Sequence, residues 1–402
     1  MTVTLLFLAN PFFISFRWIK LLLLVAVFLR FSFRIRFRYR FDYRIWVMFA
    51  ITSLLALMQG IIWKFSMLSL FTMFAFEVLT PFYLYKTYES RFFELLEKVI
   101  FGLTLTALMI WSLHELFHPL RSAFIGLINF LHPFSSEAMN NGGVKRSLLF
   151  YTFMYEDTLM DFGIYRNSGF AHEPGGFAVF ANLGLFDNLM RGKRLNTFRN
   201  LVYILAILST FSTAGIIAMF SILFIAVYQI RRLDLIVMFC MLAIPASVYL
   251  YNNTSFLGAK IQEQFEEQTD RTLNESTTGR LYGARKSINV LTNHPISGRG
   301  LLSISRPTSP NDPEFAAYGW LSDVSRYGVL FGTLGLFFFV NGFRKWVKSY
   351  TSSKLILTLG IVSLFISLSS QSYLTNPIFF TFVFLGIYYK PQLNSPSEKA
   401  LL

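Results

Sequence analysis

The 402-residue sequence has little of what a soluble enzyme usually carries. Charged residues make up 14% of it, against about a quarter in an ordinary soluble domain, whereas hydrophobic residues make up 54%. The single cysteine, Cys240, lies in an apolar block, which excludes a disulfide framework and a cysteine-based metal site. No D-x-D pair is present to hold a metal–nucleotide complex. Because the apolar residues fall in long blocks, the sequence predicts an all-α polytopic membrane protein, with residues 1–402 forming a single membrane domain.

The apolar blocks predict about twelve transmembrane helices, several of them shorter than the ~20 residues that an untilted span needs. No small-residue cleavage site follows the first apolar run, so we expect the N-terminal segment to be retained. Residues 201–230 are too long for one ordinary span, and the polar run STFST at 209–213 interrupts them. This predicts two short spans that meet at a polar hairpin.

The net charge of +14 falls largely in short connections between the apolar blocks. The positive-inside rule places these connections and both termini on the cytoplasmic side. They are residues 34–44, 86–98, 191–199, 231–232 and 344–348. The first of them alternates arginines with aromatic residues, as a nucleic-acid-binding stripe does, but between two spans it favours an anchor at the negative inner leaflet. We therefore expect the lipid bilayer as a partner and no nucleic acid.

Two large polar loops, 114–174 and 252–317, then share the outer face, and all five histidines lie in them. Within the second loop, residues 276–311 contain five basic side chains and no acid. These are Arg280, Arg285, Lys286, Arg299 and Arg306. Arginine forks without a neutralising acid suit a ligand rich in phosphate oxygens. Two plainer interpretations stay open, a solvated basic face and a charge match with the acidic run at 263–275.

The same loop predicts a helix over 279–292, capped by Thr277 or Thr278. The sequence HPISGRG then ends the helix, and Gly298 and Gly300 allow the backbone at Arg299 to approach a ligand closely.

The first loop ends in RNSGFAHEPGGF, residues 166–177, which leads directly into an apolar block. Pro174 and the glycines that follow predict a tight non-helical backbone at the membrane edge. This arrangement places His172 and Glu173, together with Arg166, at the mouth of the helix bundle.

Residues 114–118 read HELFH, the H-E-x-x-H pattern that places two zinc-binding imidazoles on one helical face. Pro119 follows at once, so we expect the helix to end there, and no second motif supplies a third ligand. Both observations disfavour a zinc site, so a membrane metalloprotease built on His114, Glu115 and His118 is kept only as an alternative. The favoured interpretation is a site with no metal and no cofactor.

Three features resemble the O-antigen polymerase and O-antigen ligase superfamily. One is R-x-x-G-x-x-x-E-P-G before a span, from Arg166 to Gly175. Another is the polar break at 209–215. The third is an outer loop of the form R…(helix)…HP-x-x-G-x-G, from Arg280 to Gly300, followed by a span with Leu321 and Gly328. The resemblance covers about 166–332, and the order of its motifs is more specific than any one of them.

The resemblance implies glycosyl transfer from undecaprenyl-diphosphate-linked oligosaccharides at the outer face of the bacterial cytoplasmic membrane. It also implies a chain-length regulator and a flippase of the same pathway as partners. In that family, arginines of the loops hold the lipid diphosphate, and the implied residues are Arg166, Arg280, Arg299 and, less strongly, Arg285. Ligases tend to carry a histidine eleven residues before the glycine at position 328. Because Ala317 occupies that place, we favour a polymerase of repeat units over a ligase.

The chemistry of the residues agrees with this interpretation. Cleaving a sugar–diphosphate bond releases negative charge onto the leaving group, and fixed arginine forks in a water-poor cleft stabilise it without a metal. The acceptor hydroxyl needs a base, for which the candidates are Glu173, His172 and Asp323, in that order. A ligase remains one alternative. A transporter or flippase is another, disfavoured because the charges concentrate in the loops and no internal repeat is visible.

Overall fold

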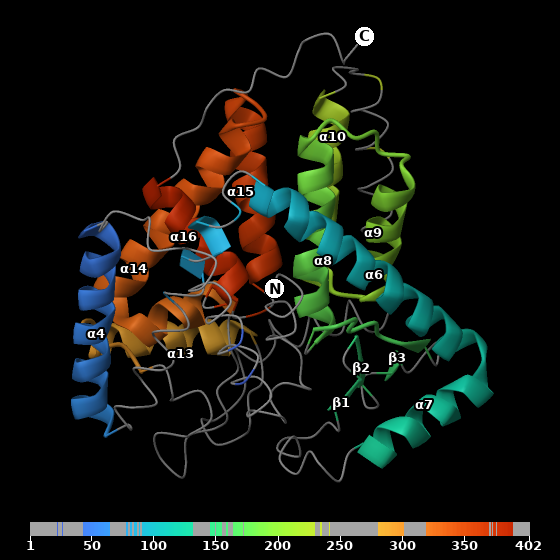
Figure 1. Cartoon of the computed structure of the whole chain (residues 1–402), viewed down its shortest axis with the longest axis horizontal. Coiled ribbons are helices and arrows are strands. Elements are labelled where there is room, and N and C mark those ends of the chain that lie inside the picture. Colours follow the sequence, from blue (N-terminus) through green and yellow to red (C-terminus); the bar gives the residue numbers. More distant parts are fainter. Residues whose placement is uncertain are drawn as a thin grey trace.

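The structure of the chain is a computed structural model, shown in Figure 1. It describes residues 43–64, 91–131, 145–148, 150–154, 158–159, 164–171, 173–229, 280–300, 319–369, 373–374 and 376–388, with isolated positions between them. The helices are α4 (Tyr43–Trp63), α6 (Phe92–Leu116), α7 (His118–Leu131), α8 (Pro174–Met190), α9 (Phe198–Ser209), α10 (Thr213–Gln229), α13 (Arg280–Asn293), α14 (Gly319–Lys348), α15 (Lys354–Leu368) and α16 (Pro377–Tyr388).

Two of these helices are long and apolar enough to cross a membrane, over Trp46–Trp63 and Gly319–Lys348. Shorter apolar helices coincide with other predicted spans, and they include α9, α10, α15 and α16. The spans predicted at 2–16, 21–33, 65–85 and 235–251 lie largely or wholly outside the described residues. The molecule is thus mostly helical, and the number of about twelve spans stays a prediction.

The all-α prediction is wrong in the first polar loop, which contains two small antiparallel hairpins. Strand β1 (Lys145–Leu148) pairs with β2 (Tyr151–Met154), and β3 (Thr158–Leu159) pairs with β4 (Ile164–Tyr165). The second strand reads YTFM, a run of aromatic and β-branched residues that favours a strand. Two-stranded sheets leave backbone groups unpaired at their edges, which water satisfies and lipid does not, so these hairpins fit a loop outside the hydrocarbon.

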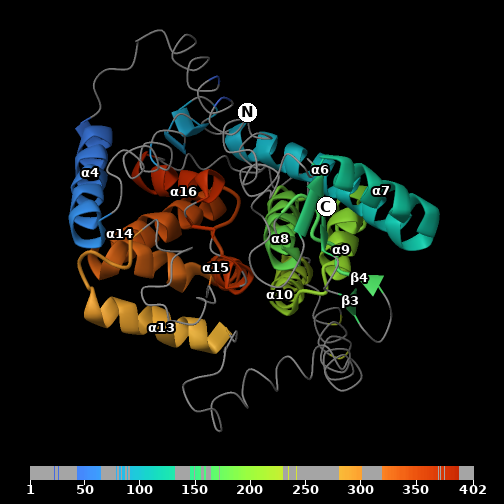
Figure 2. The ribbon, with the colours of Figure 1, turned by 90° about the horizontal axis from the view of Figure 1, so that it is seen from below.

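Helix α8 lies at the centre of the bundle. All 17 of its residues are buried, which suits its almost uncharged sequence. Figure 2 shows α6, α9 and α10 around it on one side, with α4, α13, α14 and α16 grouped on the other. Helix α15 joins the two groups by packing on α10, α8 and α14. Aromatic rings fill the interior, with Phe93 stacked on Trp346 at 4.5 Å between centroids.

The polar hairpin predicted inside residues 201–230 is confirmed. Helix α9 ends at Ser209 and α10 begins at Thr213, and the Thr197 side chain caps the start of α9 by accepting from the backbone N–H of Asn200. At the opposite end of α9 lies the basic connection 191–199. There the Arg199 guanidinium lies 2.8 Å from Glu97 Oε2, and the Asn188 amide donates to Asn200 Oδ1 at 2.7 Å.

The two ends of the bundle therefore differ. The basic connections 191–199 and 344–348 lie at one end. The first polar loop, the hairpin between α9 and α10, and α13 lie at the other (Figure 1). We call the latter the site end, because it carries Arg166, Glu173, Arg299 and Asp323.

Candidate functional site at one end of the bundle

The Arg166 segment is fixed to the polar hairpin that joins α9 to α10. Arg166 Nε donates a hydrogen bond to the carbonyl oxygen of Thr210 at 3.0 Å. The backbone N–H of Asn167 donates to Ser209 O and its side-chain amide to Ser209 Oγ, both at 2.9 Å. All four residues are buried. Two motifs that are separate in the sequence thus form one structural unit.

Glu173 lies at the first turn of α8. It is the N-cap residue with an extended backbone, and Pro174 is the first helical residue, where proline is favoured. The predicted non-helical backbone from Pro174 onward is therefore wrong, because the glycines belong to the helix. Their small size has a different use. A Cβ on Gly176 would collide with the phenol oxygen of Tyr373, so glycine lets the loop after α15 approach α8.

That loop holds the Glu173 carboxylate. The side-chain amide of Gln371 donates to Glu173 Oε2, and Glu173 is half-buried. Next to it, burial and then the charge of Glu173 raise the pKa of the Tyr373 phenol above its ordinary value. Tyr373 therefore stays protonated and neutral at neutral pH. Glu173, beside it, is partly exposed to solvent.

Asp323 is buried in the first turns of α14, with 1% of its surface exposed. Its Oδ1 lies 3.3 Å from the guanidinium of Arg326, and its Oδ2 accepts from the backbone N–H of Leu374 at 2.9 Å. Both oxygens are thus engaged. Helix α14 is interrupted at Gly328, whose φ of 79° is a left-handed conformation that favours glycine. The short segment before this kink is where the acid and the arginine are presented.

The Arg299 loop packs directly on the kink of α14. The backbone N–H of Arg299 donates to Ser325 O at 2.9 Å, and that of Gly300 donates to Arg326 O at 3.3 Å. Gly298 has a φ of 61°, and a Cβ there would overlap the backbone at Arg326 and Gly328. The glycine-flanked segment thus makes a close approach to α14, and its expected approach to a ligand stays a prediction.

Through Gln59, helix α4 contacts both the Arg299 loop and α14. The Gln59 side chain is fully buried, and its amide nitrogen donates both to Ser297 O at 2.9 Å and to Arg326 O at 2.8 Å. One amide group therefore joins the Arg299 loop to the segment of α14 that carries Arg326.

The remaining predicted residues divide into described and undescribed ones. The helix predicted at 279–292 is confirmed as α13, with Arg280 at its first position and Arg285 exposed on its surface. The side chain of Arg280, the whole of His172 and Ala317 lie outside the described residues.

The H-E-x-x-H pattern does not lie on one helix. Helix α6 ends at Leu116, Phe117 is extended with a φ of −126°, and α7 starts at His118. The break comes two residues earlier than the one expected at Pro119. His114 is buried, with Nδ1 2.8 Å from Glu115 Oε1 and its ring beside Phe153 and Tyr165. Over the described part of the chain, no three His, Cys, Asp or Glu side chains cluster as metal ligands would.

Hydrogen bonds join neighbouring elements of the site end. Arg166 contacts the hairpin before α10, Glu173 contacts the loop after α15, the same loop contacts Asp323, and Arg326 contacts the Arg299 loop. Three arginines there are buried, with 6–7% of their surface exposed. They are Arg166, Arg299 and Arg326.

Sequence reasoning missed four residues of this arrangement. They are Gln59, Arg326, Gln371 and Tyr373. One signal was present for Arg326, because an Asp and an Arg three residues apart in an apolar span predict a buried pair on one helix face. The polar segment QSYLTN between the last two spans was a second signal, because the predicted topology already placed it at the outer face.

Fold and site together define a mostly helical protein in which two of the described helices are long and apolar enough to cross a membrane. Three buried arginines, the buried Asp323 and the half-buried Glu173 lie at one end of its bundle. Residues 200–327 match the family model described as O-antigen ligase, and that family includes both polymerases and ligases of lipid-linked glycans. The resemblance to this superfamily is therefore confirmed over that segment. Proteins of the family are integral membrane glycosyltransferases. No curated protein and no solved structure matches the chain.

Proposed function

We propose that this protein polymerises undecaprenyl-diphosphate-linked oligosaccharide repeat units at the outer face of the bacterial cytoplasmic membrane. The observation that carries the proposal is that three arginines are buried at the end of the bundle that also holds Glu173 and Asp323. Arginine forks match phosphate oxygens in pairs, and Arg326 is already paired with Asp323, which leaves Arg166 and Arg299 as the buried arginines assigned to the ligand. A lipid diphosphate is the membrane-borne ligand that this charge pattern suits best.

The opposite end of the bundle supports the sidedness of the proposal. It carries the basic connections 191–199 and 344–348, which the positive-inside rule assigns to the cytoplasm. The site end then faces the periplasm, where a lipid-linked repeat unit is available after it has crossed the membrane. A flippase and a chain-length regulator of the same pathway are the partner proteins that such a reaction needs.

In the proposed mechanism, Glu173 is the general base. Its carboxylate is half-buried and oriented by Gln371, so it is held in place yet reachable by an acceptor hydroxyl. Asp323 has both oxygens engaged and instead orients Arg326 and the loop at Leu374. His172 stays the second candidate for the base.

The arginines act on the leaving group. The acceptor oxygen attacks the anomeric carbon, the carbon–oxygen bond to the diphosphate breaks, and the electron pair leaves with the diphosphate. Arg166, Arg280 and Arg299 are assigned to hold that diphosphate, with Arg285 as an outer contact. Arg166 and Arg299 are buried, so they can stabilise the developing charge with little reorganisation.

The first experiment is the polysaccharide profile, by gel, of cells that lack the protein. A surface glycan shortened to one repeat unit would support the polymerase. Full-length polymer trapped on its lipid carrier would mean a ligase, and loss of all surface glycan with repeat units held inside would mean a flippase.

Complementation of those cells with variants then tests the assignment of residues. We expect Arg299→Ala and Arg280→Ala to abolish polymer formation at normal protein levels, and Arg299→Lys to restore little, because lysine cannot make the paired contact. His114→Asn keeps a donor for Glu115 and should retain activity, whereas a zinc protease would lose it. Full activity in both alanine variants would contradict the role of the arginines.

A further inference from the structure

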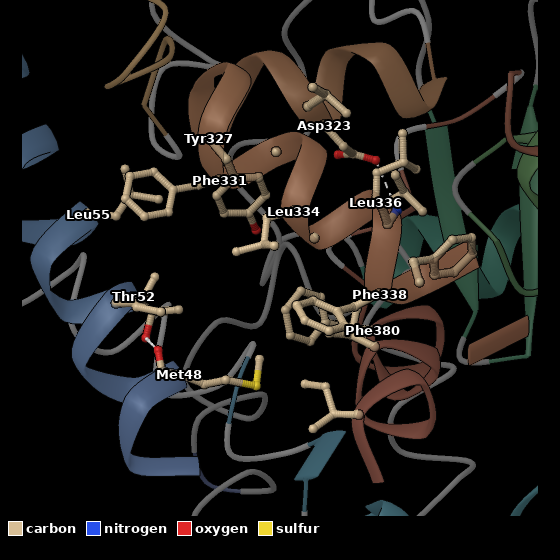
Figure 3. A pocket seen from close by; sticks show the side chains of 18 of the residues that line it. Met48, Thr52, Leu55, Asp323, Tyr327, Phe331, Leu334, Leu336, Phe338 and Phe380 are labelled. Atoms are coloured by element: carbon tan, nitrogen blue, oxygen red, sulfur yellow. Dashed lines mark hydrogen bonds between the residues drawn. The ribbon is translucent and has the colours of Figure 1, made fainter. Parts of the chain in front are cut away.

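A pocket of about 360 Å³ lies between α4, α14 and α16, and it extends from the site end toward the opposite end of the bundle. It has the size of an ordinary small-ligand site. Figure 3 shows Met48, Thr52 and Leu55 on α4 facing side chains of α14 across it, with Phe338 and Phe380 closing one side. It is separate from the arginines and carboxylates described above, except that Asp323 lies at its edge (Figure 3).

The middle of the pocket offers a ligand almost no polar group. Midway along α4, the hydroxyl of Thr52 donates to the carbonyl oxygens of Met48 and Phe49 in its own helix, at 2.9 and 3.0 Å. The other hydroxyls that line the pocket are the phenols of Tyr43, at its far end, and of Tyr327 on α14. The carboxylate of Asp323 is engaged by Arg326 and by the N–H of Leu374. A sugar or a phosphate would lose its hydrogen bonds with water in this space and find too few polar groups to replace them. The ligand must therefore be a hydrocarbon.

The two ends of the pocket are polar, which gives the ligand a direction. Arg44 closes the end remote from the site, where its guanidinium lies over the Tyr388 ring at 5.7 Å and donates to Ile387 O at 3.5 Å. Asp323 lines the other end, beside Arg326. From Tyr43 to Leu55 the α4 wall is about 18 Å long, at ~1.5 Å per residue. A slot of this kind suits the part of an apolar chain nearest a charged head group.

We propose that this pocket binds the polyprenyl chain of the lipid-linked substrate next to its diphosphate. The inference rests on the proposed function, because it takes the arginines at the site end as the partner of that diphosphate. The occupant is a prenyl chain and not a phospholipid acyl chain, since Asp323 connects the pocket directly to Arg326 and, through the backbone of Arg326, to the Arg299 loop. Aromatic rings and the polarisable sulfur of Met48 line it, and both pack well against flat, branched isoprene units.

Gly335 makes the proposal testable. It lines the pocket, and a Cβ at this position would meet no atom within 4 Å, so a side chain can be introduced there without a backbone clash and would take up space in the pocket. Gly102 on α6 has the same open surroundings but lies outside the pocket, which makes it the matched control. The test measures polymer formation by Gly335→Leu, Gly335→Phe, Gly102→Leu and Gly102→Phe in membranes, at equal protein levels.

We expect the Gly335 variants to raise the KM for a repeat unit on a long polyprenyl diphosphate about tenfold, with phenylalanine worse than leucine and kcat little changed. The Gly102 variants should match the wild type. Normal KM in both Gly335 variants would overturn the proposal.

A binding measurement separates the pocket from the reaction. Native mass spectrometry of the purified protein should show a bound polyprenyl phosphate in the wild type and in Gly102→Phe, but much less in Gly335→Phe. If phosphatidylglycerol is retained instead and polyprenyl phosphate does not displace it, the pocket is a phospholipid site and the inference is wrong. If polyprenyl phosphate binds in this Gly335-dependent way while no glycan is transferred, the pocket stands and the proposed function fails.

Discussion

The buried amide of Gln59 offers a direct test of how the site is held together. Replacing it with leucine keeps the bulk of the side chain but removes the donor shared by Ser297 O and Arg326 O. Arg326 O still accepts from the N–H of Gly300 at 3.3 Å, so Ser297 O is the carbonyl that the substitution affects most. A buried carbonyl without its donor costs about 1–3 kcal/mol. That cost falls on the contact between the Arg299 loop and α14.

The expected consequence is a smaller fraction of molecules with Arg299 in position. A cost of about 1–3 kcal/mol corresponds to a roughly 5–150-fold change in such an equilibrium. Turnover of lipid-linked repeat units by purified Gln59→Leu protein in a bilayer should therefore fall about tenfold. KM should change less than kcat if the diphosphate still binds through Arg166.

Asn188→Leu is the matched control, because it also removes one buried amide donor, here to Asn200 Oδ1 at the opposite end of the bundle. Both variants should unfold at a lower temperature than the wild type. Only Gln59→Leu should lose turnover at a temperature where both are folded. Equal loss of turnover in the two variants, or full turnover in Gln59→Leu, would refute the argument that Gln59 positions the Arg299 loop.

Two further predictions concern the contact between α8 and the loop after α15. Gly176→Ala should lower the melting temperature, and glycan synthesis should fall about tenfold or more, because the added methyl group overlaps the phenol oxygen of Tyr373. Tyr373→Phe in the same chain should restore part of both, as measured by thermal unfolding and by glycan synthesis. Absence of any rescue would contradict the contact. The second prediction is a pH dependence of stability. Burial and the charge of Glu173 raise the pKa of Tyr373 in the folded protein, so its contribution to stability is present below about pH 10 and is lost as the pH rises beyond it. Melting temperatures between pH 8 and 11 should therefore decline less steeply in Tyr373→Phe, and parallel curves would show that Tyr373 plays no part.

The elements that could be predicted from sequence are those in which a local pattern decides the conformation. Apolar blocks predicted the helices, the STFST run predicted the turn between α9 and α10, and HPISGRG predicted the end of α13. The two β-hairpins escaped prediction because strands of two to four residues carry too short an alternation to be recognised inside a mixed polar loop.

Most charged residues of the candidate site, though not Arg326, could be picked out from the sequence, whereas the contacts that hold them could not. Arg166 and Arg299 stand out in the sequence because each lies in a glycine-containing motif. Gln59 does not, because a single glutamine in an apolar helix looks the same whether it faces a cavity or bridges two loops. Its partner carbonyls are 238 and 267 residues away in the chain. No local pattern encodes a pairing at that separation.

The extent of the site also shows what the family-matched segment lacks. Residues 200–327 contain the hairpin, α13, the Arg299 loop and Asp323. They do not contain Arg166, Glu173 or Gln371, which the structure attaches to that segment through Thr210 O, through α8 and through the loop at Leu374. The matched segment thus supplies part of the proposed diphosphate site. The proposed base and one proposed arginine come from residues before it, and Gln371, which orients the base, comes from a loop after it. Since the base and the leaving-group cations are held by different elements that meet only when the bundle is assembled, the reaction we propose requires the packing of α8 and α16 as much as it requires the basic loop.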